Sequence, residues 1–353
     1  MDIFRAMRTC SRRNLFRVAL LTPLLVFGCS TGHEERRLTG TPLTPMEAAG
    51  QNGFSGILGV HKAGFLSENR QTRKRLLYLE GTHYEIGYQV GYLCPEDVKF
   101  MVHDYCNEIL FEMLDLPFGS KDIGPLWGSI RAWLKDLVIA SENAIPSSLL
   151  EEMHGIADGY TEAPSEGRLP WDIAVEYADV LLLNQGMDAL SSLTYHTLGK
   201  GTLACNQFAC WGDRTDDGRL LHGRDFQFYT AGVYQDVSLV AVYRPLNADR
   251  TPSGYPFIAV TAPGFVGQAT ALNSQGISIG IDVVHSWAAR QGDPGLGGLM
   301  LIRAVMETAA TLEEAIKMVQ DADRGCPWLY LVADGKTRSA AVLETIQSGV
   351  PPS

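Results

Sequence analysis

The chain has 353 residues, of which 46% are hydrophobic and 20% charged, and its formal net charge is −11. This composition is typical of a globular protein that can bury a core. The acidic balance argues against a nucleic-acid partner and against basic docking on anionic lipid. After the N-terminal segment, no apolar run is long enough to cross a bilayer as a helix.

Residues 1–29 are predicted to be a lipoprotein-type signal peptide. A short apolar run, Val18 to Phe27, has about half the length that a membrane-spanning helix needs. It leads into Gly28 and Cys29, which resemble the site where a lipoprotein thiol receives its lipid. The segment Ser11 to Arg17 resembles a twin-arginine export motif, and an ordinary secretory signal with incidental arginines is the alternative. Either interpretation predicts export, with a lipid anchor at Cys29 holding the protein to a membrane on the periplasmic side or at the cell surface.

The rest of the chain divides into three parts. Residues 30–69 show no sustained period and are predicted to be a tether. Residues 70–204 are predicted to be a mainly helical pre-sequence, with a short strand at Arg73–Leu79 and a helix that begins near Tyr84. Residues 205–353 are rich in short strands separated by turns, with one helix over Gly298–Gln320 whose continuation is capped by Thr311, with Glu314 completing a capping box. This order predicts an α+β protein in which antiparallel sheets are covered by helices.

Five cysteines follow the predicted signal peptide, an odd number at irregular spacings: Cys94, Cys106, Cys205, Cys210 and Cys326. They do not form a disulfide framework, and a thiol left over in an oxidising compartment calls for a chemical explanation. The sequence has no zinc-ligand spacing, no phosphate-binding glycine loop and no Gly-x-Ser-x-Gly motif. No metal or organic cofactor is therefore expected.

Cys205 begins the most informative stretch of the sequence. Two strand-like segments, Cys205–Cys210 and Leu220–Phe228, are joined by a polar loop that contains glycine. A hairpin of these segments places Arg224 and Asp225 on the partner strand of Cys205. A nearby cation favours a thiolate, and a carboxylate can orient the attacking group. The pattern therefore predicts a cysteine nucleophile.

These segments resemble the acyl-coenzyme A:isopenicillin acyltransferase-like family (peptidase C45) of cysteine N-terminal-nucleophile hydrolases. In that family the hairpin carries Gly-Arg/Gln-Asn-x-Asp-aromatic after the nucleophile. Other motifs agree in the expected order from about residue 75 to residue 345. They are Glu80–Gly91 and Glu152–Gly159 in the pre-sequence, Leu272–Gly276 at a turn, and Leu301–Val305 with Thr311–Ala315 in the late helix.

The resemblance implies an αββα sandwich and a precursor that cuts itself between Ala204 and Cys205. The new α-amine of Cys205 then serves as general base for its own thiol, and backbone N–H groups with Asn273 stabilise the oxyanion. The implied substrate is an amide of an acylated small molecule or peptide, with hydrolysis or acyl transfer as the outcome. The processed α and β chains are expected to stay associated.

Two features depart from the family pattern. The chain has Asp225-Phe226-Gln227 where the family usually has Asn-x-Asp, so either Asp225 or Gln227 stands for the family carboxylate. Asp225 is expected to point at the site, because strand residues two apart share a face. The chain also ends at Ser353, about 150 residues into the predicted catalytic portion, which predicts a C-terminally truncated product.

Several alternatives stay open at this stage. Cys205 alone also fits a buried strand cysteine or one half of a disulfide with Cys210. Asn273 precedes a turn glycine, which is ordinary turn chemistry, and Asp282 is interpreted as a polar strand terminus. A phospholipase-B-like ester hydrolase and a non-catalytic lipoprotein relic of the same fold are the alternative functions.

Overall fold

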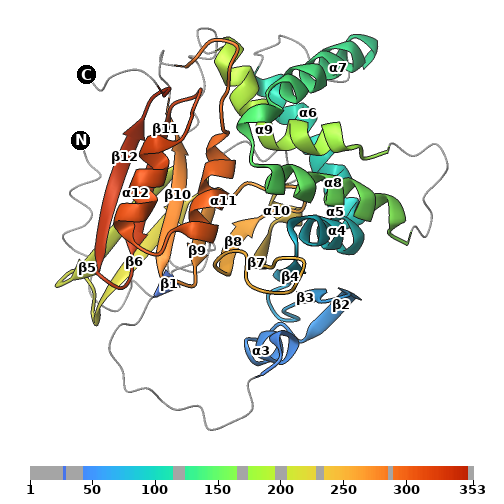
Figure 1. The fold of residues 1–353 in the computed structure, drawn as a ribbon. Helices are drawn as coiled ribbons and strands as arrows, with labels where there is room; N and C mark the ends of the chain where they lie inside the picture. The colour runs from blue at the N-terminus through green and yellow to red at the C-terminus, as the bar shows by residue number, and fades with distance from the viewer. Residues whose placement is uncertain are drawn as a thin grey trace, which may run out of the picture.

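The computed structural model describes residues 27–28, 43–113, 124–164, 174–194, 205–227, 234–284 and 289–348. Two sheets and two groups of helices make up this part of the chain (Figure 1). Cys29 and Ala204, the predicted lipid site and the residue before the predicted cut, lie outside the described residues. None of the described helices is long and apolar enough to span a membrane.

The larger sheet has nine strands, and all neighbours are antiparallel except the parallel pair β4 and β7. Its order from one edge to the other is β12 (Ser339–Thr345), β11 (Trp328–Asp334), β10 (Ile277–Val283), β9 (Thr270–Asn273), β8 (Phe257–Thr261), β7 (Leu239–Pro245), β4 (Arg75–Gly81), β3 (Gly64–Glu68) and β2 (Gly56–His61). The smaller sheet has the order β1 (Phe27–Gly28), β6 (Gly218–Asp225) and β5 (Asn206–Gly212).

The two sheets pack on each other where β5 lies over β10 and β11. Helices α11 (Gly298–Thr308) and α12 (Leu312–Asp321) cover the large sheet over β9 to β12 (Figure 1). The predicted α+β class is therefore confirmed. Of the four layers of the expected αββα sandwich, the described residues supply these helices, the large sheet and the small sheet.

Most of the remaining helices lie beside the part of the large sheet that contains β7 and β4 (Figure 1). They are α4 (His83–Leu93), α5 (Pro95–Phe100), a π-helical turn (Met101–Tyr105), α6 (Cys106–Met113), α7 (Gly124–Ala140), α8 (Ser147–Glu162) and α9 (Tyr177–Thr194). A short helix, α10 (Tyr234–Val237), precedes β7. Most of the described pre-sequence after β4 is helical, as the sequence predicts.

Two helix starts that the sequence predicts are present. Before α4, the Thr82 hydroxyl accepts a hydrogen bond from the Glu85 N–H at 3.3 Å, and the Glu85 carboxylate accepts one from the Thr82 N–H at 2.9 Å. Thr311 and Glu314 form the same reciprocal capping box before α12. Each box satisfies N–H groups that a helix end otherwise leaves without partners.

The tether prediction is wrong for much of residues 30–69, because α3 (Pro45–Gln51), β2 and β3 lie there. Phe65 and Leu66 in β3 are buried, so this segment belongs to the core of the large sheet. The hairpin turns at Lys62, whose φ of 52° lies in the left-handed region without a glycine to signal it. Strands β2, β3 and β4 therefore belong to the same sheet as the strands that follow Cys205.

The two pre-sequence motifs meet where α4 crosses α8. Four glycines, two from each motif, lie at the crossing: Gly87, Gly91, Gly155 and Gly159. A Cβ on Gly87 would lie 1.9 Å from the backbone oxygen of Glu152, and the other three positions leave similarly little space. The glycines are thus required for the close approach of the two helix backbones.

Candidate active site

The β5–β6 hairpin that the sequence predicts after Cys205 is present, and its register is fixed by two pairs near Cys205. Gln207 pairs with Arg224 and Asn206 pairs with Asp225. Cys205 directly precedes β5, two residues before Gln207, so its side chain is on the same face as Gln207 and Arg224. In this position Cys205 is the diagonal cross-strand neighbour of Arg224, a separation of about 7–8 Å that a long side chain can bridge.

Cys205 and Arg224 both border one pocket, whose empty space is about 800 Å³ when the part open to solvent is counted. Apolar side chains from the helices and the sheet dominate the walls, among them Ile109, Leu182, Met187, Val260, Ile281 and Val283. The pocket is therefore a place for an apolar group next to a thiol and a guanidinium.

The Cys205 thiol differs from the other described thiols in its surroundings. Cys205 is half-buried and free of any disulfide, and its Sγ lies 3.9 Å from the carbonyl oxygen of Gln227. Cys106 also borders the pocket, but it is buried, and burial raises its thiol pKa to about 11. Cys94 and Cys326 are buried as well, and burial raises the pKa of each. Cys210 is free too, so the alternative of a Cys205–Cys210 disulfide does not apply in this structure.

Arg224 is nearly enclosed, with 6% of its side chain exposed. Its two terminal nitrogens donate to the backbone oxygens of Asp225 and Ile281. Asp282 lies next to the guanidinium, with its Oδ1 3.6 Å from Nη1 of Arg224. The sequence interpretation of Asp282 as a mere strand terminus missed this pairing.

Asp225 does not meet the expectation that it points at the site. It is exposed and lies on the opposite face of β6 from Arg224, because successive strand residues alternate in direction. Gln227, the other position considered for the family carboxylate, is also exposed, and only its backbone oxygen contacts the thiol.

Asn273 lies away from the pocket, and both ends of its side-chain amide are engaged elsewhere. Its Nδ2 donates to the backbone oxygens of Met306 and Ala309 at 3.1 and 2.7 Å, and its Oδ1 accepts from two N–H groups of the β9–β10 turn. The turn is also far from Arg224. Ile277, the first residue of β10 after the turn, is five residues before Asp282, the neighbour of Arg224, and five residues correspond to about 17 Å of extended strand. This geometry fits the turn role that the sequence left open and not the expected oxyanion contact.

Polar side chains fill part of the space between the two sheets next to the pocket. His222 contacts the Ser278 hydroxyl through Nδ1 at 2.7 Å and the Gln207 amide oxygen through Nε2 at 3.2 Å. Burial lowers the pKa of His222 to about 4, so the ring is neutral near neutral pH. Gly280 leaves room for these groups, since a Cβ there would lie 2.1 Å from the Gln207 amide oxygen and 3.2 Å from Cδ of Arg224.

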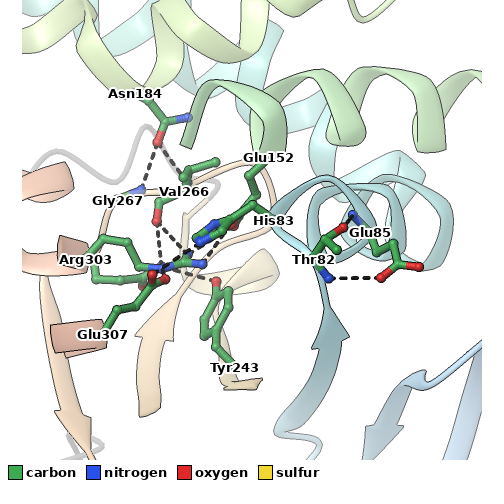
Figure 2. Close-up of polar contacts among 11 residues, drawn as sticks. Thr82, His83, Glu85, Glu152, Asn184, Tyr243, Val266, Gly267, Arg303 and Glu307 are labelled. Atoms are coloured by element: carbon green, nitrogen blue, oxygen red, sulfur yellow. Dashed lines mark hydrogen bonds and ion pairs between the residues drawn. The ribbon is translucent and has the colours of Figure 1, made fainter. Parts of the chain in front are cut away.

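Asn184, which also borders the pocket, fixes one of its loops. Its Oδ1 accepts hydrogen bonds from the N–H groups of Val266 and Gly267 at 2.8 and 3.2 Å (Figure 2), and its Nδ2 donates to the oxygen of Gly264 at 2.8 Å. The loop that borders the sheet side of the pocket is thereby held by a helix of the pre-sequence. The sequence offers no local signal for this contact.

A buried cluster of charges joins helices before Cys205 to a helix after it (Figure 2). Arg303 in α11 donates to both oxygens of Glu152 in α8 at 3.0 and 2.7 Å, and its Nε donates to Glu307 at 2.5 Å. His83 in α4 lies between the two carboxylates, 3.0 Å from Glu152 and 3.3 Å from Glu307. The Tyr243 ring packs against the guanidinium, whose carbon is 4.5 Å from the ring centre.

The cluster holds His83 and Glu307 in their charged forms. Burial alone favours a neutral His83, but its bonds to Glu152 and Glu307 outweigh burial and raise its pKa to about 9. Burial likewise opposes the charge on Glu307, and the adjacent Arg303 and His83 lower its pKa to about 2. Charged groups removed from water in this way are strongly dependent on one another.

A family model matches most of the β-rich part of the chain. Residues 214–351 match the family model described as AAT, Acyl-coenzyme A:6-aminopenicillanic acid acyl-transferase. The family resemblance inferred from the motifs is thereby confirmed for this part of the chain, which is similar to that acyltransferase family. The matched part begins nine residues after Cys205, so it contains Arg224 and Asp282 but not the predicted nucleophile.

Curated relatives cover more of the chain. An uncharacterized protein of Archaeoglobus fulgidus is 38% identical over 280 residues, which are 77% of this chain and 43% of that protein. Protein dcd1A of Dictyostelium discoideum is 21% identical over 279 residues, 76% of this chain and 58% of that protein. The chain thus spans about half the length of the curated relatives it matches.

Among solved structures, the Caenorhabditis elegans N-acylethanolamine-hydrolyzing acid amidase ortholog matches 40% of this chain and 63% of its own. The sequence identity is 16% and the TM-score 0.31.

Proposed function

We propose that the protein is a cysteine amidohydrolase or acyltransferase that acts on amides with an apolar acyl group, with Cys205 as nucleophile. The observation that carries the proposal is that Cys205 and Arg224, from neighbouring strands, border the same apolar pocket. The family match supports acyl chemistry, and the pocket walls support an apolar acyl group.

The proposal includes activation by self-cleavage between Ala204 and Cys205. The Cys205 thiol attacks the Ala204 carbonyl carbon, the peptide C–N bond breaks, and a thioester forms as the nitrogen becomes a free amine. Water then hydrolyses the thioester, which leaves a carboxylate on Ala204 and regenerates the thiol. The amine nitrogen has a basic lone pair that the peptide nitrogen lacks, so it accepts the thiol proton only after the cut.

Turnover then follows two steps. The thiolate attacks the substrate carbonyl carbon, and the leaving amine takes the proton from the Cys205 α-amine as the C–N bond breaks. Water or a second amine attacks the resulting thioester and restores the thiol, which gives hydrolysis or acyl transfer respectively. Arg224 is placed to stabilise negative charge beside the thiol, as charge-assisted contacts do.

Both halves of the cleaved chain are needed for the proposed site. Pocket walls come from the helices before the cut and from the sheet after it, and the charge cluster joins the same two parts. Separation of the chains would expose the apolar walls of the pocket to water and leave buried charges without their partners. The α and β chains therefore stay associated in this proposal.

A series of 4-nitroanilides with acetyl, butyryl, hexanoyl and succinyl acyl groups tests the proposal. Each buried methylene is worth about 0.8 kcal/mol, so kcat/KM is expected to rise about fourfold per methylene until the pocket is full. Succinyl, which carries a charge, is expected to react more slowly than butyryl. Initial rates of nitroaniline release provide the measurement.

A pocket variant and a remote variant make this test specific. Met187→Glu in the pocket wall should remove the dependence on chain length, whereas Met46→Glu on the exposed side of α3 should preserve it. Equal rates for succinyl and hexanoyl substrates would contradict an apolar acyl site. Turnover of the matching 4-nitrophenyl esters without any anilide turnover would favour the ester hydrolase instead.

A further inference from the structure

The carboxylate nearest to Arg224 comes from the large sheet and not from the hairpin. Residues of β10 that face the small sheet are Ser278, Gly280 and Asp282, and each meets the hairpin: Ser278 bonds His222, Gly280 makes room, and Asp282 approaches Arg224. Asp282 itself is 7% exposed and does not border the pocket, so it stands behind the guanidinium as seen from the pocket.

Arg224 and Asp282 each have a buried polar atom that is available for a hydrogen bond. Arg224 Nε and Asp282 Oδ1 are both buried without a hydrogen-bond partner within the described part of the chain. The terminal nitrogens of Arg224 donate to neutral backbone oxygens, which do not compensate its charge. Within the described part of the chain, the carboxylate that pairs with this guanidinium is that of Asp282, at 3.6 Å. A buried charge that loses its counter-charge is strongly destabilised and moves toward solvent.

We propose that Asp282 is the positioning residue for Arg224 and supplies the negative charge that the hairpin lacks. The chain has Gln227 where its family usually has the hairpin aspartate, and Asp225 faces solvent on the opposite side of β6. Asp282 holds the guanidinium from behind, and Phe226 packs near it, with the guanidinium carbon 5.8 Å from the ring centre. Arg224 is thereby kept beside the thiol of Cys205. The catalytic consequence rests on the proposed function of Cys205, whereas the positioning itself does not.

The catalytic arm of the test uses Asp282→Asn and Asp282→Glu in the full-length protein. Asp282→Asn is expected to lower kcat for the hexanoyl anilide roughly tenfold or more while KM stays within about twofold, because charge-assisted contacts of this kind are lost and the acyl pocket is not. Asp282→Glu keeps the charge and should restore part of kcat. The double variant Asp282→Asn with Arg224→Gln should be no slower than Arg224→Gln alone, since the two groups act as a unit.

Asp97→Asn is the matched control. Asp97 pairs with Arg75 at 2.6 Å, and its side chain is 19% exposed, but neither residue borders the pocket. Loss of this pair is expected to lower the melting temperature without changing kcat. If Asp282→Asn also lowers only the melting temperature, or if its effect multiplies with that of Arg224→Gln, the positioning role is wrong.

A second arm does not need turnover. Iodoacetamide alkylation of Cys205, followed by mass spectrometry of the peptide that contains it, reports how well the thiolate is stabilised. If Asp282 keeps Arg224 in place, Asp282→Asn releases the guanidinium and alkylation near neutral pH slows. Removal of a negative charge with Arg224 still in place would speed alkylation instead, so faster alkylation overturns the proposal. An inactive wild type combined with slower alkylation in Asp282→Asn would refute the proposed function and retain the positioning role.

Discussion

Cys205→Ala is expected to abolish hydrolysis of the hexanoyl anilide. The substitution removes the only atom that forms the acyl bond in the proposed mechanism, so the loss should be on the order of a thousandfold or more. Cys205→Ser should retain a small fraction of the rate, because a hydroxyl is the poorer nucleophile near neutral pH. Initial rates are the measurement, with melting temperatures to show that each variant is folded.

Cys210→Ala is the matched control for this prediction. Cys210 lies in β5, the strand that Cys205 precedes, and is free and half-buried like Cys205, but it does not border the pocket. Its replacement is expected to leave turnover within about twofold of wild type, as for a surface change far from the reacting atoms. A folded Cys205→Ala protein with normal turnover would mean that the nucleophile lies elsewhere.

Glu152→Gln is expected to lower the free energy of unfolding by about 3–5 kcal/mol. Glu152 is 1% exposed and holds both Arg303 and His83, so its neutral replacement leaves buried positive charge without compensation. Urea unfolding measures the effect, which should appear in the midpoint with little change in the slope. Asp321→Asn, which breaks an exposed pair with Lys317, should cost less than about 1 kcal/mol.

The same cluster predicts how stability changes with pH. The pKa of His83 is raised to about 9 in the folded protein, so its contribution is complete below its ordinary value of 6.5 and is lost as the pH rises through 9. The pKa of Glu307 is lowered to about 2, so its contribution is present above its ordinary value of 4.5 and is lost as the pH falls toward 2. Both contributions are complete between about pH 4.5 and pH 6.5, so the wild type should be most stable in this range. In Glu152→Gln the alkaline loss should shrink, because one of the two carboxylates that raise the pKa of His83 is gone.

Local patterns were sufficient to predict the hairpin and the helix starts. The capping boxes at Thr82 and Thr311 use residues three apart, and the pairing of Cys205 with the Arg224 strand follows from two segments joined by one turn. These features depend on neighbours in the sequence. The same reasoning could not fix which face Asp225 occupies, because a shift of one residue in register reverses every side chain.

Contacts between distant segments account for what sequence reasoning missed. Asp282 reaches Arg224 only because one sheet packs on the other. The side-chain amide of Asn273 donates hydrogen bonds to backbone oxygens at the end of α11. Strand β3 pairs with β4, and β4 pairs in parallel with β7, which follows Cys205, so this hairpin joins the sheet through a partner that is distant in the sequence. Such partners are set by tertiary packing, which overrides local propensity.

The most direct test of Cys205 as an N-terminal nucleophile is the N-terminal sequence of the purified full-length protein, made without added protease. The expected result is two chains that co-purify and separate on denaturation, one of them beginning with Cys205, and a single uncut chain for Cys205→Ala. A wild-type chain that remains uncut and still hydrolyses amides at the full rate would contradict the account.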